Sequence, residues 1–347
     1  PERKKSNIHP ALEQQLLEAA DTSGKMQLRK LIEIVSGQYG AEFGGKGGGH
    51  VNVVTRGGSN EFRGTAFEFL RNDAFDSRNY FAPEDAPVPP FRQNQFGGSL
   101  GGPIVKNRLF FFANYEGSRN TSTVTQLATV PTAAMRQGNF SGLNPIFDPG
   151  TTTGGARQPF PGNVIPAGRL DPAAQVLLEV VPLPNRPGIA NNYLGQAERD
   201  REDDQVNLRL DYSMAGGDLL FGRLSIGQIE ALEPFGARGS NALPGFPSLV
   251  NTNSRNAVVS YTRNLSSRHV MNVLLGYNYV DGGINTQNQD LEIARRAGIQ
   301  VLQDVSPELS GVPAVNTTFT SPFGDDLSTL IRTNSTYQAS AQFFFST

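Results

Sequence analysis

The sequence predicts an all-β fold built from antiparallel strands, which form either the wall of a transmembrane β-barrel or a soluble sandwich. Several segments of about ten residues alternate apolar and polar side chains, as strands with two different faces do. Short turns between these segments alternate with very long connections. No run approaches the ~18 consecutive apolar residues of a membrane helix, and the mean hydropathy is low, at -0.34.

The composition excludes several classes of function. With 30 Lys and Arg against 32 Asp and Glu, the net charge is -2, so we expect no nucleic-acid partner, which would require a clustered basic field. The absence of cysteine excludes a disulfide scaffold, a thiolate zinc site and a cysteine nucleophile. The 38 glycines and 23 prolines suit many turns and long polar loops.

The first 32 residues carry no clear assignment. Pro10–Ala20 has Leu12, Leu16 and Leu17 on one helical face, which predicts a short surface helix. The chain begins with Pro1 and stops within a strand-like run. We therefore expect both ends to be truncated, and the lack of a visible export signal to be uninformative.

A glycine-rich stretch precedes the strand-like part. The run Gly44–Gly49 permits close backbone approach and positive φ. His50–Arg56 is a short β run, and Gly57–Asn60 has the composition of a turn.

Eight segments then have strand character. In Gln205–Tyr212, the clearest, Val206, Leu208, Leu210 and Tyr212 share one face. The long connections Asn120–Asp204, Gln228–Asn253 and Asp281–Asn334 favour a membrane barrel, because loops beyond ~15 residues are uncommon in compact soluble domains. The eight segments are Phe62–Arg71, Gln93–Gly102, Leu109–Gly117, Gln205–Tyr212, Leu219–Ile226, Asn256–Asn264, His269–Val280 and Thr336–Phe345.

Two blocks of sequence resemble TonB-dependent outer-membrane receptors, most closely their Oar-like group. Gly37–Asp73 is similar to the end of the plug and the entry into the barrel, and Phe91–Arg119 to the second and third barrel strands. Val130–Gly142 and Pro161–Ala174 are similar to parts of the first long loop. The resemblance implies a plug inside a barrel of about 22 strands, of which eight strands are an incomplete, N-terminal part.

On this resemblance, residues 33–58 are the C-terminal end of the plug and residues 59–347 the barrel, with extracellular loops near 120–204, 228–253 and 281–334. The implied location is the outer membrane of a Gram-negative bacterium. The implied partners are outer-membrane lipid, the TonB complex acting through an N-terminal segment that this chain lacks, and an unidentified imported ligand. The candidate plug residues are Gly44, Gly45, Gly47, Gly48, Gly49, Asn52, Thr55 and Arg56.

Other motifs have plainer explanations. Gly40–Lys46 matches the start of a phosphate-binding loop, but Gly47 stands where Ser or Thr should hold Mg²⁺. The histidines His9, His50 and His269 lack ligand spacing. Asp203 with Asp204 suggests a solvated strand entrance, and Asp325 with Asp326 lacks the oxygen ladder of a calcium loop. We expect no catalytic residues, cofactor or metal site, and no enzyme activity.

Three functions stay open on the sequence. The first is a receptor that binds a ligand outside the cell and imports it by energised movement of the plug. The second is a passive porin or a surface-exposed structural or adhesive barrel. The third, a soluble β-rich enzyme, lacks candidate chemistry. No set of residues selects a ligand.

Overall fold

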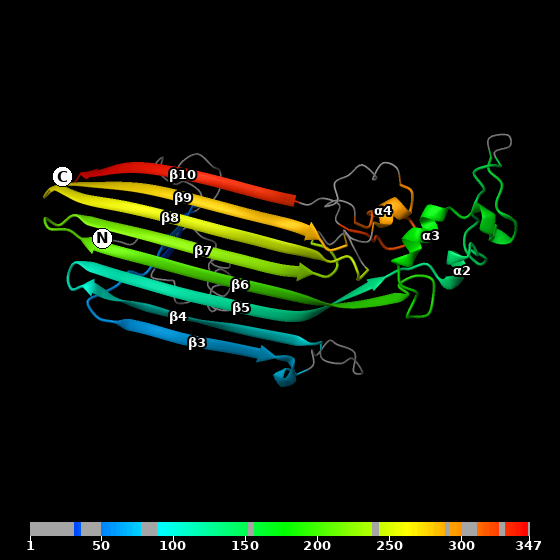
Figure 1. Ribbon diagram of the computed structural model, residues 1–347, viewed down its shortest axis with the longest axis horizontal. Helices are drawn as coiled ribbons and strands as arrows, with labels where there is room; N and C mark the ends of the chain where they lie inside the picture. Colours follow the sequence, from blue (N-terminus) through cyan, green and yellow to red (C-terminus); the bar gives the residue numbers. More distant parts are fainter. Residues whose placement is uncertain are drawn as a thin grey trace.

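The computed structural model describes residues 31–35, 50–77, 89–151, 156–237, 243–288, 292–299, 311–325 and 330–345. These residues form two antiparallel sheets (Figure 1). A two-stranded sheet pairs β1 with β2. An eight-stranded sheet contains the others in chain order, from β3 at one edge to β10 at the other. The strands are β1 (Leu31–Val35), β2 (His50–Val54), β3 (Arg63–Asn72), β4 (Phe91–Val105), β5 (Leu109–Ala128), β6 (Tyr193–Ser213), β7 (Leu219–Glu233), β8 (Ser248–Ser266), β9 (His269–Thr286) and β10 (Leu330–Phe345).

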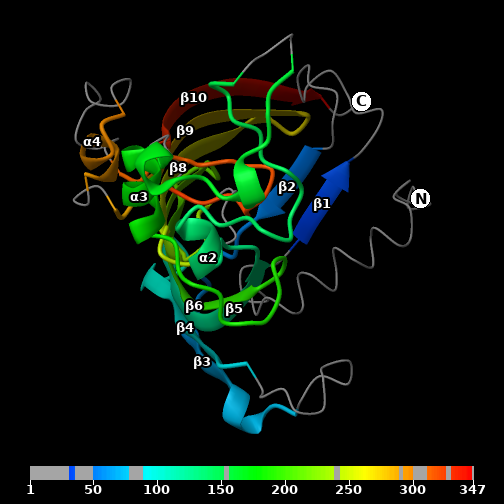
Figure 2. The same cartoon turned by 90° about the vertical axis from the view of Figure 1, so that its right-hand side faces the viewer.

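The eight-stranded sheet confirms the all-β prediction, and each of the eight predicted strand segments corresponds to one of its strands, with only Phe62 falling outside its strand. Every neighbour in the sheet is also a neighbour in the chain, so the sheet is a simple up-and-down meander. Viewed along its length it is a curved wall, and it does not close into a barrel (Figure 2). Its edge strands, β3 and β10, each have one unpaired side.

The strands are longer than predicted. β5 has 20 residues and β6 has 21, although the predicted loop began at Asn120 and ended at Asp204. The three long connections are therefore 129–192, 234–247 and 287–329, shorter than the predicted 120–204, 228–253 and 281–334. The prediction was wrong because it ended each strand where the alternation ends, whereas backbone pairing continues through polar and charged residues.

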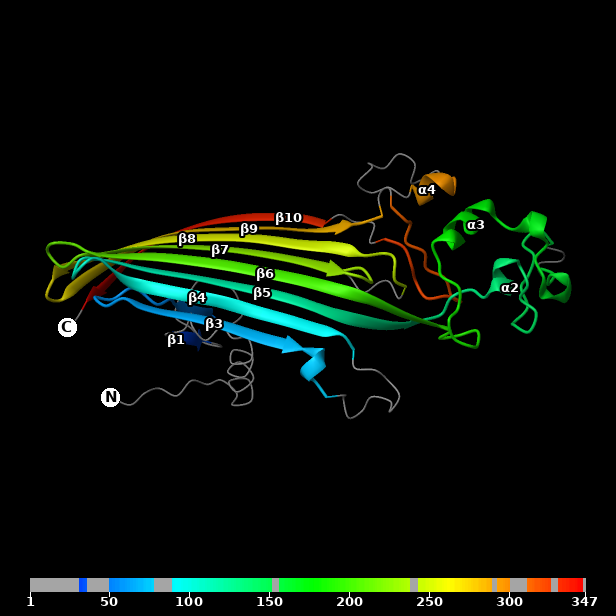
Figure 3. The same cartoon turned by 60° about the horizontal axis from the view of Figure 1, so that its bottom comes forward.

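The connections differ at the two ends of the sheet. Short turns join β4 to β5, β6 to β7 and β8 to β9 at one end (Figure 3). In the turn after β6, Gly216 and Gly217 have φ of 104° and 89°, a left-handed conformation that favours glycine. The long connections leave the opposite end, and they carry the helices α2 (Ala133–Arg136), α3 (Pro172–Glu179) and α4 (Ile293–Arg296).

The two faces of the sheet have opposite chemistry. One row of directly paired residues contains Leu100, Ala113, Leu208, Leu224 and Ala257, and its leucines are exposed. The opposite face contains Gln95, Asn207 and Ser260, which are buried. We call these the outer and inner faces. The predicted alternation in Gln205–Tyr212 is confirmed, because Leu208 and Leu210 lie on the outer face and Asn207 on the inner face.

The outer face changes character where the alternation ends. The Tyr115 hydroxyl donates to the Asp204 carboxylate at 2.6 Å, and the Arg119 guanidinium binds Asp204 at 2.8 Å and Glu202 at 3.3 Å. The ring of Phe96 covers Gly117, where an added Cβ would stand 2.8 Å from the ring. Aromatic rings followed by charges are typical of the level at which a barrel wall leaves the apolar part of a bilayer.

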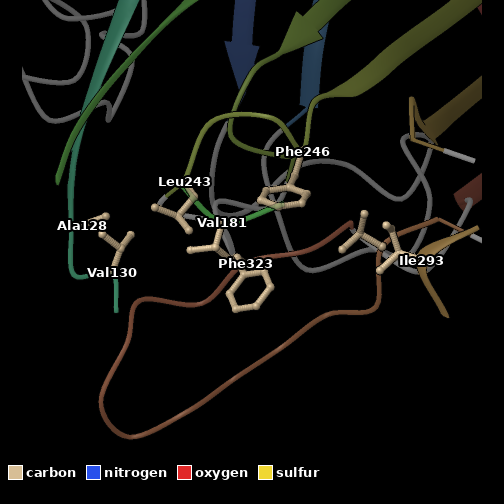
Figure 4. Close-up of a cluster of buried hydrophobic side chains, with 8 residues drawn as sticks. Ala128, Val130, Val181, Leu243, Phe246, Ile293 and Phe323 are labelled. Carbon is tan, nitrogen blue, oxygen red and sulfur yellow. The ribbon is translucent and has the colours of Figure 1, made fainter. Parts of the chain in front are cut away.

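The long connections fold into a cap with its own apolar core (Figure 4). We use the name loop cap for the described parts of 129–192, 234–247 and 287–325. The core joins side chains from all three connections, and the rings of Phe246 and Phe323 lie 6.0 Å apart. Its members are Ala128, Val130, Val181, Leu243, Phe246, Ile293, Val312 and Phe323.

The cap core gives the first testable prediction. Phe246 is 1% exposed, so Phe246→Ala should cost about 3–5 kcal/mol of local stability. Hydrogen exchange should accelerate more than a hundredfold in the loop cap and stay unchanged in the sheet. Phe147→Ala, at a ring that is 50% exposed, is the matched control. Equal effects of the two variants would show that the cap does not depend on this core.

The two faces give a second prediction, for the complete barrel. Leu275 on the outer face and Asn278 on the inner face both lie in β9 and are both exposed. If lipid covers the outer face, Leu275→Arg should destabilise the protein by about 2–4 kcal/mol near the bilayer midplane, whereas Asn278→Arg should be tolerated. Reversible unfolding in lipid vesicles measures both. Equal penalties would contradict the assignment of the faces.

Candidate functional site

The β1–β2 hairpin lies on the concave side of the large sheet and is not part of it (Figure 2). Its register pairs Leu31 with Val54 and Val35 with His50. β1 begins at Leu31, so the predicted boundary at residue 33 cuts this strand. The resemblance to known sequences starts at Glu33, but Leu31 and Ile32 continue the same β-forming run.

The segment that follows the hairpin is held on the inner face by Arg209. The Arg209 guanidinium donates hydrogen bonds of 3.1 Å to both the carbonyl and the hydroxyl of Thr55. Asp211 holds the same guanidinium at 2.6 Å, and the Phe221 ring lies 4.5 Å below it. Because the guanidinium is fixed on these sides, it is a preorganised donor for the segment at Thr55.

Gly57 and Gly58 let this segment lie directly on the wall. A Cβ at Gly57 would stand 2.7 Å from the Asp211 carboxylate, and one at Gly58 would stand 2.4 Å from the backbone carbonyl of Phe111. Neither glycine is among the residues with positive φ. The predicted turn at Gly57–Asn60 is therefore a close approach of two backbones, for which any side chain at Gly58 is too large.

The end of the segment is also tied to the wall. The Asn60 side-chain amide donates to Asn107 Oδ1 at 2.6 Å, and its own oxygen accepts from the Asn107 backbone N–H at 2.8 Å. Asn107 lies in the turn between β4 and β5 and has φ of 62°. We call residues 55–60 the wall segment. It contacts the wall from Arg209 at Thr55 to the β4–β5 turn at Asn60.

The structure places only part of the predicted site. Thr55 is a contact residue of the wall segment, and Arg56 beside it is exposed. Asn52 lies in β2 opposite Glu33. The predicted Gly44, Gly45, Gly47, Gly48 and Gly49, the loop-like Gly40–Lys46 and the predicted helix Pro10–Ala20 fall outside the described residues.

Sequence reasoning missed Arg209 and Asp211 as site residues. Both occupy the polar face of the most regular predicted strand, and this position was the only indication of their role in the sequence. Arg209 contacts Thr55, which lies 154 positions away in the sequence. A local pattern shows that such a residue faces inward and does not show what it touches.

A polar trough of about 470 Å³ lies on the inner face, nearer the loop cap than Arg209. Gln95 donates to the Glu116 carboxylate at 2.7 Å within it. Just below, the Asn114 Oδ1 and Asn207 Nδ2 atoms are buried without a hydrogen-bond partner. The trough offers donors and acceptors of hydrogen bonds, and its lining includes Gln93, Gln95, Glu116, Ser118, Asp203, Gln205, Ser225 and Asn256.

Four of the other acidic and histidine candidates have structural contacts, whereas His9 and Asp326 lie outside the described residues. Asp203 and Asp204 lie within β6, not at its entrance, and bind Arg201 and Arg119. Asp325 is 2% exposed and accepts from the Val312 N–H at 2.6 Å and from Asn288 at 2.8 Å. His269 contacts Ser266 at the end of β8.

Among the residues that the structure describes, no group of three or more histidine, aspartate or glutamate side chains is placed to hold a metal ion. No helix there is both long enough and apolar enough to cross a membrane.

The Arg209 contact gives a third prediction. Arg209→Gln removes the charged donor, and hydrogen bonds to charged groups contribute about 1.5–3 kcal/mol each. Hydrogen exchange in residues 55–60 should therefore accelerate at least about tenfold. Arg263→Gln, at an exposed arginine of the outer face, is the control and should leave these residues unchanged. If the two variants exchange alike, Arg209 does not hold the wall segment.

Comparison with known proteins supports the same architecture. Over 92 residues the chain is 39% identical to the TonB-dependent transporter Oar of Myxococcus xanthus, which covers 25% of this chain. The matched region spans only 9% of that relative's length. No solved structure matches.

A family match covers most of the chain and extends from the end of β2 to the end of β10. Residues 54–346 match the family described as "Outer membrane beta barrel domain". With the partial relative, this match places the protein in the outer membrane of a Gram-negative bacterium, with lipid against its outer face. The chain belongs to the outer membrane β-barrel domain family.

Proposed function

We propose that this chain is part of a TonB-dependent transporter, in which β1, β2 and the wall segment are the end of a plug. The observation that carries the proposal is the hairpin on the inner face, joined to the wall through Thr55 and Arg209. A passive pore needs no separate sheet inside its wall. The partial likeness to a protein named a TonB-dependent transporter supports the same function.

The contacts suggest where the moving part begins. Gly57, Gly58 and Asn60 are packed or hydrogen-bonded to the wall, so the wall segment is the pivot. The residues before Thr55 are the part that TonB would pull, and their displacement opens the polar trough toward the periplasm. The trough's amides, hydroxyls and carboxylates then line the route of the ligand, with no catalytic step.

The alternative is a passive or adhesive surface barrel. The loop cap favours it to some extent, because a folded core in the extracellular loops provides a rigid surface for contact with other cells or polymers. This function requires no energy and no movement of the hairpin. The two proposals therefore differ in one measurable property, the response of the inner face to energisation.

These 347 residues contain no cysteine, so one cysteine introduced among them reports on one position once any cysteine elsewhere in the full-length protein is replaced. In the full-length protein with Asn52→Cys, labelling by a membrane-impermeant maleimide should rise severalfold in energised cells. It should stay low when the proton-motive force is collapsed or TonB is deleted. Ser141→Cys, at an exposed position of the loop cap, is the control and should label equally with and without energy.

Labelling of Asn52→Cys that is the same in energised and TonB-deleted cells would contradict the transporter proposal. It would favour the passive or adhesive barrel. Entry of vancomycin, measured in the same cells, reports separately whether either variant has displaced the plug and opened a leak.

A further inference from the structure

A second cavity, of about 890 Å³, lies inside the loop cap. It is open to solvent on one side and is lined by two stretches far apart in sequence, residues 129–190 and 315–323. Its volume is near the upper end of the ~300–1,000 Å³ typical of small-molecule sites. The apolar side chains of its lining include Phe140, Leu143, Leu170, Leu177, Val315 and Phe323.

The wall of this cavity is built in advance of any ligand. Val130 and Phe323 line it and also belong to the cap core. Arg136 donates to the carbonyls of Leu178 at 3.1 Å and Val181 at 2.9 Å, which fastens α2 to the end of α3. Burial lowers the pKa of the Arg136 guanidinium. A site with fixed walls loses little entropy when it binds.

The charged residues of the lining all have partners within the cap. Arg136 is bound to backbone carbonyls, and Arg169 binds Asp148 at 2.7 and 3.0 Å. The bonds from Arg169, and then from the Gly150 N–H, lower the pKa of the Asp148 carboxyl. Asp171 accepts from the Ala173 N–H at the start of α3. The two guanidinium groups are thus already bound within the cap, and the exposed Asp171 carboxylate caps α3. The lining therefore offers little to a charged ligand, whose burial without a counter-ion is costly.

We propose that this cavity binds an uncharged, apolar small molecule. The volume, the apolar lining and the compensated charges determine this class of ligand. Ile189 and Phe319, which are 55% and 75% exposed, also line the cavity and would close over the ligand. The cavity lies at the loop end of the wall, where a molecule arriving from outside meets the protein first. This class of ligand would be the substrate of the proposed transporter. Binding in the cavity does not depend on the proposed function, whereas import after binding rests on it.

The experiment uses the full-length protein in outer-membrane vesicles without energisation. The probe is a long-chain aliphatic alcohol that carries a photoreactive diazirine, and peptide mass spectrometry locates the labels. We expect saturable labelling of peptides from 129–190, which the unlabelled alcohol should compete away. Labelling of the outer face around Leu208 should not saturate, because it reports lipid contact. The carboxylate analogue of the probe should label the cap at least tenfold less.

Two variants test the cavity itself. Ala174→Phe fills it from α3, because Ala174 lines it and is exposed, and should reduce cap labelling about tenfold. Ala167→Phe adds the same ring at an exposed alanine that is absent from the lining and should have no effect. Leu143→Lys places a cation in the cavity, and should shift its preference toward the carboxylate probe. Unchanged hydrogen exchange in the cap shows that each variant has folded.

Cap labelling that survives Ala174→Phe, or prefers the carboxylate probe in the unaltered protein, would overturn the proposal. A complete lack of cap labelling would also overturn the proposal. This outcome is expected if another segment of the protein or a second copy of it occupies the cavity. The readout needs neither TonB nor energy. Saturable labelling of the cap, found together with maleimide labelling of Asn52→Cys that does not depend on energy, would therefore support the binding site and contradict the transporter proposal.

Discussion

Pairing of the backbone between neighbouring strands is the constraint on which this structure depends. A bilayer offers no hydrogen-bond partner, so each strand of the wall must satisfy its N–H and C=O groups on the next strand. This demand is met by a meander of eight strands whose neighbours are also neighbours in sequence. In the described sheet it leaves one unpaired side on each of the edge strands, β3 and β10. Beyond the apolar belt, where water can also satisfy these groups, β5 and β6 still stay paired through Arg119, Glu202 and Asp204.

A wall of this kind has no ordinary interior, since one face meets lipid and the other faces the lumen. A segment that is fixed to the polar inner face must be held there by polar contacts, and Arg209 makes such contacts with the wall segment. Its guanidinium binds Asp211 on its own strand and Thr55 across the lumen side, while Gly57 and Gly58 allow the backbones to touch. The same features permit a pivot, because a few directed bonds hold the wall segment without a large apolar interface.

The sequence predicted the strands and their faces well because alternation is a local property. Gln205–Tyr212 shows its outward residues without any knowledge of the neighbouring strands. The ends of β5 and β6 were predicted wrongly, because pairing beyond Gly117 depends on the partner strand and leaves no apolar signal. The contact of Arg209 with Thr55 could not be predicted for the same reason. Resemblance supplied the segment that we propose to be the end of a plug, and only its last residues, such as Thr55, lie among the described residues with their side chains.

The loop cap follows from the same constraint. The sheet cannot bury apolar side chains between two layers, so apolar residues that must avoid water have to gather elsewhere. Phe246, Val312 and Phe323 do so above the wall, in a core like that of a soluble domain. The strands that continue beyond the bilayer carry this core outward on a rigid base. A preformed apolar cavity needs packed walls, and in this protein the cap is where packing of that kind is found. In the function that we propose, recognition of an apolar molecule and control of its passage are therefore separated, the first in the cap and the second at the wall segment around Thr55.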